Sequence, residues 1–171
     1  MLKIVKYPDS ILKEKSKEVR HDDKSLRSLI PHMVDAMKKN QGIGLAAPQI
    51  GISKKVIVVT EGEEVHAFLN PKIIKQSKGK ERDEEGCLSL PGLFVKVLRS
   101  KQVEVTAQTI DGKEVRVKAR GLGARIFQHE IDHIEGKLII HRISPLTRWK
   151  LRNQLKNLAK LTPLEIKNSH G

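Results

Sequence analysis

The stretch that decides the fold is LGARIFQHEIDHIEG, residues 122–136. Its apolar residues recur every three or four positions, as on an amphipathic helix, and a glycine stands where that helix would end. These residues are Leu122, Ile126, Phe127, Ile131 and Ile134, with Gly136 as the C-cap. His129 and His133 would lie one turn apart on one face, so both imidazoles can reach one metal ion. We expect a central helix over 122–135 that carries an HExxH motif.

Runs of β-branched residues around this helix predict short strands. The runs cover residues 56–59, 65–69, 73–75, 103–109 and 114–119. Asp111-Gly112 is typical of a hairpin turn between the last two. Because the strands come in hairpins rather than alternating with helices, the fold class is expected to be α+β, with antiparallel β-sheets around the central helix.

Two further helices and one loop complete the expected order of elements. An apolar stripe over 25–40 predicts a helix before the strands. The segment GIGLAAPQ, residues 42–49, is small and glycine-rich, which indicates a loop at a site. After Pro145, a C-terminal helix is expected to run to about residue 161.

Composition limits the class of protein. The chain has 171 residues, 38% of them hydrophobic, with a formal charge of +13, which fits one domain over 1–171. It contains neither a signal-peptide pattern nor an apolar run long enough to span a membrane, so a cytoplasmic protein is expected. A single cysteine, Cys87, cannot form an internal disulfide, which is typical of a reducing compartment.

A catalytic metal site needs a third protein ligand beside the two histidines. The candidates are a distant carboxylate, Cys87 and the other histidines, namely His21, His32, His66, His141 and His170. Cys87 is preferred because a thiolate binds Zn or Fe well, although an isolated cysteine is often only a small buried apolar residue. Glu130 could reach a water on the metal without being a ligand.

Three segments together resemble the signature motifs of the peptide deformylases, in the family's order. They are GIGLAAPQ (42–49), EGCLS (85–89) and QHEIDH (128–133). The likeness extends over about residues 4 to 160. It implies a metal-dependent hydrolase that removes the N-formyl group from the initiator methionine of nascent polypeptides and releases formate.

The resemblance also implies roles for individual residues. The metal ligands would be Cys87, His129 and His133. Glu130 would be the general acid and base, and Gln49 and the backbone N–H of Leu88 would face the developing oxyanion. Substrate-binding residues would be Ile43, Gly44, Leu122 and Ile126, with the backbone at 43–44 pairing with an extended peptide.

Other positions carry weaker expectations. Asp132 faces away from the two histidines on a helix, and the resemblance points to Arg99 as its partner, although Asp132 could be an ordinary surface charge. Glu85 either orients the segment of Cys87 or is solvated. His141 stands where the family more often has Asp, which affects local packing rather than catalysis.

The resemblance implies one divalent ion per chain, with Fe(II) in the cell and Zn, Ni or Co as substitutes. It implies N-formylmethionyl nascent peptides as substrates. No membrane partner is expected, and the chain is expected to be a monomer or weak dimer. Residues 137–171 hold eight Lys and Arg against Glu165, or +7 of the total charge. This segment is either a solvated surface or a contact for ribosomal RNA.

Three other interpretations account for part of the pattern. A zincin-type protease also has HExxH, but it takes its third ligand from further along the chain. A basic RNA-binding protein would leave GIGLAAPQ and EGCLS unexplained. A deformylase-like protein without activity is disfavoured because Glu130 and all the candidate ligands are present.

Overall fold

The computed structural model describes residues 3–167, of which 161–167 are described by their backbone. Five strands form an antiparallel sheet in the order β1-β2-β3-β6-β7. Their bounds are β1 Gly44–Ala46, β2 Val56–Glu61, β3 Glu64–Gln76, β6 Gln102–Gln108 and β7 Glu114–Arg120. A separate ribbon pairs β4 (Lys80–Cys87) with β5 (Leu90–Ser100). The helices are α1 Leu26–Lys39, α2 Gly121–Ile134, α3 Pro145–Lys150 and α4 Arg152–Lys167.

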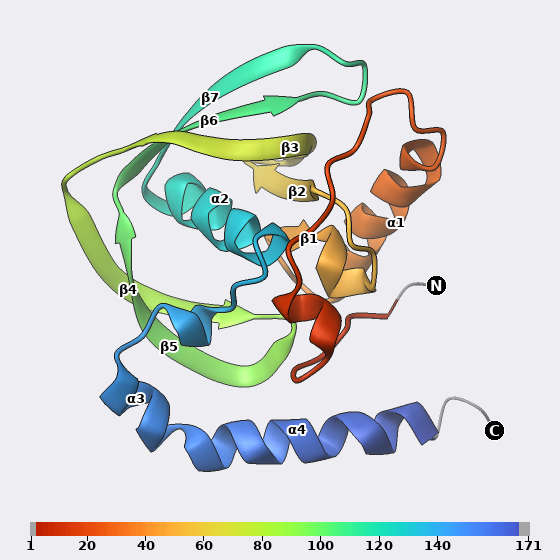
Figure 1. Ribbon diagram of the computed structural model, residues 1–171. Helices are drawn as coiled ribbons and strands as arrows, with labels where there is room; N and C mark the ends of the chain where they lie inside the picture. Colours follow the sequence, from red (N-terminus) through yellow and green to blue (C-terminus); the bar gives the residue numbers. More distant parts are fainter. Residues whose placement is uncertain (1–2, 168–171) are drawn as a thin grey trace.

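Helix α2 lies between the five-stranded sheet and the β4–β5 ribbon, and α4 runs along the outside of the ribbon (Figure 1). Strand β2 shows why both faces of the larger sheet are covered. Ile57 and Val59 pack in one cluster with α2, whereas Val56 and Val58 pack in another with α1. Because successive strand residues point to opposite faces, a strand buried on both sides has a continuous apolar run.

A third apolar cluster joins the ribbon to the C-terminal part of the chain. It contains Leu93, Val95 and Val97 of β5, the turn at 139–141, and Leu155 of α4. This packing holds the end of β4 close to α2.

The C-terminal end of α2 closes against the N-terminal segment of the chain. Gly136 has a φ of 71°, and a Cβ there would lie 2.5 Å from the carbonyl oxygen of Lys13. The backbone N–H of Ser16 donates to the carbonyl of Ile134 over 2.8 Å. Only glycine combines this backbone angle with so close an approach.

The predicted α+β class, the central helix and the hairpin of β6 and β7 are confirmed. Helix α1 and strand β2 also agree with the prediction to within two residues at each end. Gly112 has a positive φ in the expected turn. Within residues 3–167, no helix is both long and apolar enough to cross a membrane.

Four details of the predicted order were wrong. Within 42–49, only residues 42 and 43 are loop, whereas 44–49 belong to strand β1 and the 3-10 turn η2 (Ala47–Ile50). The two strands expected at 65–69 and 73–75 are one strand, β3, with register shifts around Asn70, whose φ is 50°.

The other two differences concern the ribbon and the C-terminal helix. Strands β4 and β5 were not predicted. Strand β4 reads KERDEEGC, and most of these residue types are depleted in strands. The helix expected over 145–161 is two helices separated at Leu151, and the second continues to Lys167. After this break α4 packs Leu155 against the cluster with β5.

Candidate metal centre

Cys87, His129 and His133 come together at the junction of the ribbon and α2. Their candidate ligand atoms all lie within 4.8 Å of one another, and Cys87 Sγ is 3.2 Å from His133 Nε2. Cys87 ends β4, while the two imidazoles project from adjacent turns of α2. In the described part of the chain, this is the one cluster of three such residues suited to an ion. The third candidate ligand is therefore upstream of HExxH, unlike that of a zincin.

The other candidate ligands lie elsewhere. His21, His32, His66 and His141 are not part of the cluster. His170 lies outside the described residues.

The electrostatic surroundings of Cys87 favour the form that binds metals. Burial alone would raise the pKa of its thiol, but His133 and His129 together lower that pKa well below the usual value. A thiolate with two imidazoles is a donor set suited to Zn²⁺ or Fe²⁺, and three protein ligands leave a position for water or substrate. The residues therefore fit a catalytic divalent ion.

A carboxylate outside the cluster orients one imidazole. Glu85 Oε2 lies 3.1 Å from His129 Nδ1, which leaves the Nε2 side of that ring toward the cluster. Arg99 donates to both oxygens of Glu85 at 2.9 and 3.0 Å, and Arg125 donates to Oε1 at 2.7 Å. Burial would raise the pKa of Glu85, but hydrogen bonds with His129 and Arg99 lower it to about 2. Glu85 is thus an ionised, fully paired group rather than a solvated one.

Asp132 is paired with Arg99, the partner to which the resemblance pointed, over 2.5 Å. Arg142 also contacts Asp132, with its Nε 2.9 Å from Oδ2. Burial opposes ionisation of Asp132, but Arg142 and Arg99 lower its pKa. Arg142 was not predicted in this role.

Glu130 is placed differently from the other acids of the site. Its side chain is buried, Oε2 has no hydrogen-bond partner, and burial raises the pKa of the carboxyl group. A Cβ on Gly44 would lie only 2.5 Å from Glu130 Oε1, so β1 passes directly against this carboxylate. A carboxyl group with a raised pKa and a free oxygen is suited to accept and return a proton.

Gln49 and Leu88 lie beside Cys87. Gln49 Oε1 accepts from the N–H of Ala46 at 2.9 Å, which directs its Nε2 toward Cys87 Sγ, 3.6 Å away. Leu88 follows Cys87, and its carbonyl accepts from Lys6 Nζ over 2.9 Å. The amide of Gln49 therefore supplies a donor next to the cluster.

A pocket of about 580 Å³ opens over this cluster. The sequence-predicted residues Ile43, Gly44, Leu122 and Ile126 all line it, together with Leu88 and Glu130. Phe94 was missed; its ring covers the backbone of Gly86 and is 63% exposed at the pocket wall. The apolar and β-branched run over 93–98, LFVKVL, was the signal that could have revealed this strand, although it does not mark Phe94 as outward-facing.

Arg125 was also missed, although its position carried a signal. It precedes His129 by four residues, so on a helix the two side chains share a face. His141, the departure from the resemblance, lies away from the cluster, and its Nδ1 accepts from the N–H of Leu138 over 2.9 Å.

Comparisons with known proteins agree with one another. The family model described as polypeptide deformylase matches residues 1–149. A peptide deformylase of Thermotoga neapolitana is 42% identical over 160 residues, covering 94% of this chain and 98% of that protein. The chloroplastic peptide deformylase 1B of Oryza sativa subsp. japonica is 41% identical, covering 99% of this chain and 68% of the rice protein. The inhibitor complex of Arabidopsis thaliana peptide deformylase 1B superposes with a TM-score of 0.90 at 38% identity, covering 96% and 93% of the two chains.

Proposed function

Because this chain belongs to the polypeptide deformylase family, we propose that Cys87, His129 and His133 hold one divalent ion and that Glu130 transfers the proton. The chain is a metal-dependent hydrolase that removes the N-formyl group from nascent polypeptides. The observation that carries the assignment of residues is the convergence of three ligand atoms within 4.8 Å. The unpaired oxygen of Glu130 beside them supports it.

A bound ion would supply Lewis acidity toward the formyl oxygen and lower the pKa of water. Glu130 accepts the proton of the attacking water and returns it to the leaving amine, which its raised pKa favours. Gln49 Nε2 and the backbone N–H of Leu88 donate to the developing oxyanion. Loss of one such donor costs about 3 kcal/mol in other oxyanion holes.

We propose that the substrate binds as an additional strand. Strand β1 pairs with β2 and stands at the edge of the five-stranded sheet, so its other edge can pair with an extended peptide. Ile43 and Gly44 supply backbone groups there, and Leu88, Leu122 and Ile126 surround the methionine side chain in the pocket.

Formate release from formyl-Met-Ala-Ser tests the assignment. Metal-loaded wild type is expected to turn over, Glu130→Ala to lose at least about 100-fold in rate while keeping its ion, and Cys87→Ser to lose both ion and activity. Retained activity in Glu130→Ala would contradict the role of Glu130. Full metal content in Cys87→Ser would contradict the ligand set.

We propose Fe(II) as the ion in the cell, because a thiolate in the ligand set suits Fe(II) and Zn. Cys87 beside Fe(II) is open to oxidation. We expect the iron form to lose activity in air and the nickel or cobalt form to retain it. Equal lifetimes of the iron and nickel forms in air would argue against this.

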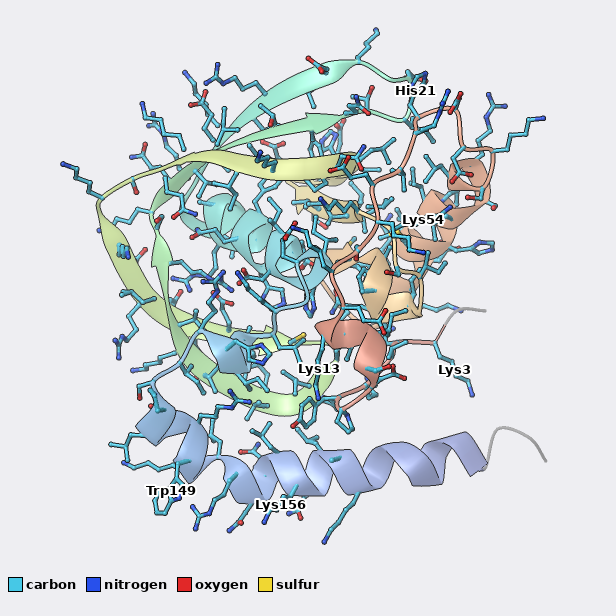
Figure 2. All side chains as sticks on the ribbon, viewed as in Figure 1. Lys3, Lys13, His21, Lys54, Trp149 and Lys156 are labelled. Carbon is cyan, nitrogen blue, oxygen red and sulfur yellow. The ribbon has the colours of Figure 1, made fainter. Side chains whose placement is uncertain are left out.

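We also propose that the basic C-terminal segment contacts the ribosome. Arg148, Lys150 and Arg152 lie on α3 and α4, and Figure 2 places Trp149 and Lys156 along the outer edge of the molecule. Arg152 stacks on the exposed Trp149 ring, 4.0 Å from its centroid, an arrangement that also suits stacking on RNA bases.

Charge reversal is the appropriate test, because truncation would remove the buried Leu155. Arg148, Lys150 and Arg152 together changed to Glu should weaken ribosome binding at low salt and spare hydrolysis of formyl-Met-Ala-Ser. Unchanged ribosome binding would contradict this proposal.

A single domain over 1–171, a cytoplasmic location and a monomer or weak dimer complete the proposal. Size-exclusion chromatography measures whether the protein is a monomer or a dimer.

A further inference from the structure

We propose that Arg125 is a positioning residue, which holds the Glu85 carboxylate against His129 and thereby fixes how that imidazole faces the ion. This inference rests on the proposed function, because it takes His129 as a metal ligand. It concerns an arginine that reaches the site only through another side chain.

Arg125 and His129 are joined by one carboxylate. They lie one turn apart on the same face of α2. Arg125 Nη1 donates to Glu85 Oε1 over 2.7 Å, while Glu85 Oε2 lies 3.1 Å from His129 Nδ1. Each oxygen of Glu85 is thus assigned to one of the two helix residues.

The guanidinium of Arg125 is itself fixed. Nη1 also donates to the carbonyl of Val97 at 3.1 Å, and Nη2 donates to the carbonyl of Glu81 at 3.2 Å. The side chain is only 11% exposed. Arg125 therefore ties α2 to both strands of the ribbon, and it cannot turn away without leaving buried polar groups unpaired.

Glu85 is attached to α2 on both sides of His129. On one side Arg125 belongs to the helix. On the other side, Arg99 donates to both oxygens of Glu85 and also to Asp132, which follows His129 by three residues. Loss of Arg125 would leave the carboxylate attached at one side only. Partners that orient a ligating histidine typically change metal affinity 10- to 100-fold when they are removed.

The affinity for Zn²⁺ separates this role from simple electrostatics. Arg125→Met keeps most of the side-chain length and removes the guanidinium. Positioning predicts that Zn²⁺ binds at least about tenfold more weakly to this variant, measured by competition with a chromophoric chelator. Loss of a nearby positive charge would by itself tighten cation binding, so the two explanations differ in sign.

Arg116→Met is the matched control, because it removes an arginine from a carboxylate, Glu104, in a pair between β7 and β6 that is separate from the network of Glu85 and Asp132. Its Zn²⁺ affinity is expected to stay within about twofold of wild type. A double-mutant cycle adds a second test. If Arg125 acts through Glu85, then Arg125→Met in a Glu85→Gln background should weaken binding no further.

Unchanged or tighter Zn²⁺ binding by Arg125→Met would overturn the proposal, as would an equal loss in Arg116→Met. Additive losses in the cycle would overturn it as well. Should Arg125→Met fail to fold, Arg125→Gln is measured with the same expectation and the same criterion. Failure of the wild type to bind Zn²⁺ would instead contradict the proposed metal site.

Discussion

At the scale of single residues, the site depends on how each carboxylate is surrounded. Glu85 and Glu130 are both buried, yet the pKa of Glu85 is lowered to about 2 and that of Glu130 is raised. Cationic partners surround the first, whereas burial dominates for the second. One acid is thereby kept as a fixed anion, and the other holds a proton more readily than an ordinary carboxyl group.

Gly44 is expected to be essential because no side chain fits between β1 and Glu130. A Cβ at this position would lie 2.5 Å from Glu130 Oε1 and 2.9 Å from Ile126 Cγ2. Gly44→Ala should therefore displace the carboxylate and lower kcat/KM at least about tenfold, with bound metal unchanged. Gly79→Ala is the control, since its nearest neighbour would be 3.9 Å away. Wild-type kinetics in Gly44→Ala would show that Glu130 tolerates the shift.

His141 should make stability depend on pH away from the metal site. Burial, followed by the charges of Arg148 and Lys13, lowers its pKa, and the N–H of Leu138 donates to its unprotonated Nδ1. The folded state thus favours the neutral ring. Its contribution is fully present above the unfolded pKa of about 6.5 and is lost as pH falls through the lower folded pKa.

The measurement is the thermal unfolding midpoint between about pH 7.5 and 5, bracketing the usual histidine pKa. His141→Asn keeps an acceptor for Leu138 but does not titrate, so its midpoint should fall less on acidification than that of wild type. Parallel curves for the two proteins would exclude this contribution.

At the scale of elements, sequence reasoning succeeded where one pattern governs a whole segment. Helix α2 has both its apolar stripe and its histidine spacing in a single stretch, and β2 is a continuous apolar run. Strand β4 is mostly exposed and charged, so pairing with β5 rather than its own composition makes it a strand. The convergence of Cys87 with α2 follows from that pairing, which is why spacing could nominate the cysteine but could not place it.

Helix α2 should tolerate, and gain from, one substitution near its start. Gly123 lies in the first turn, and a Cβ there would be 3.8 Å from Ala119 Cβ, an ordinary contact. Gly123→Ala should raise stability by about 0.5–1 kcal/mol because glycine loses more backbone entropy than alanine. The unfolding midpoint is expected to rise by about 1 to 4 °C. A lower midpoint would mean that the helix needs glycine at this position.

At the scale of the whole molecule, the proposed ion joins the ribbon to the central helix. Cys87 ends β4 and the histidines belong to α2, so a bound ion would stabilise the packing of the two parts. At a free metal concentration about 1,000 times Kd, linkage predicts about 4 kcal/mol of added stability. That corresponds to roughly 10 °C in the unfolding midpoint.

Differential scanning calorimetry of metal-free and zinc-loaded protein tests this expectation. Cys87→Ser should show little stabilisation by zinc, while Gly79→Ala should respond as wild type does. Identical midpoints for the two forms of the wild type would contradict a site that bridges β4 and α2.

The closure of Gly136 and Ile134 on residues 13–16 has a consequence for how the protein is made. Synthesis delivers the N-terminal segment first, but its partners at the end of α2 emerge only after all the strands have been translated. The backbone N–H of Ser16 therefore cannot form its hydrogen bond to Ile134 until the last turn of α2 has been made. A newly made chain can complete its fold only when residues 13–16 are still accessible to the end of α2.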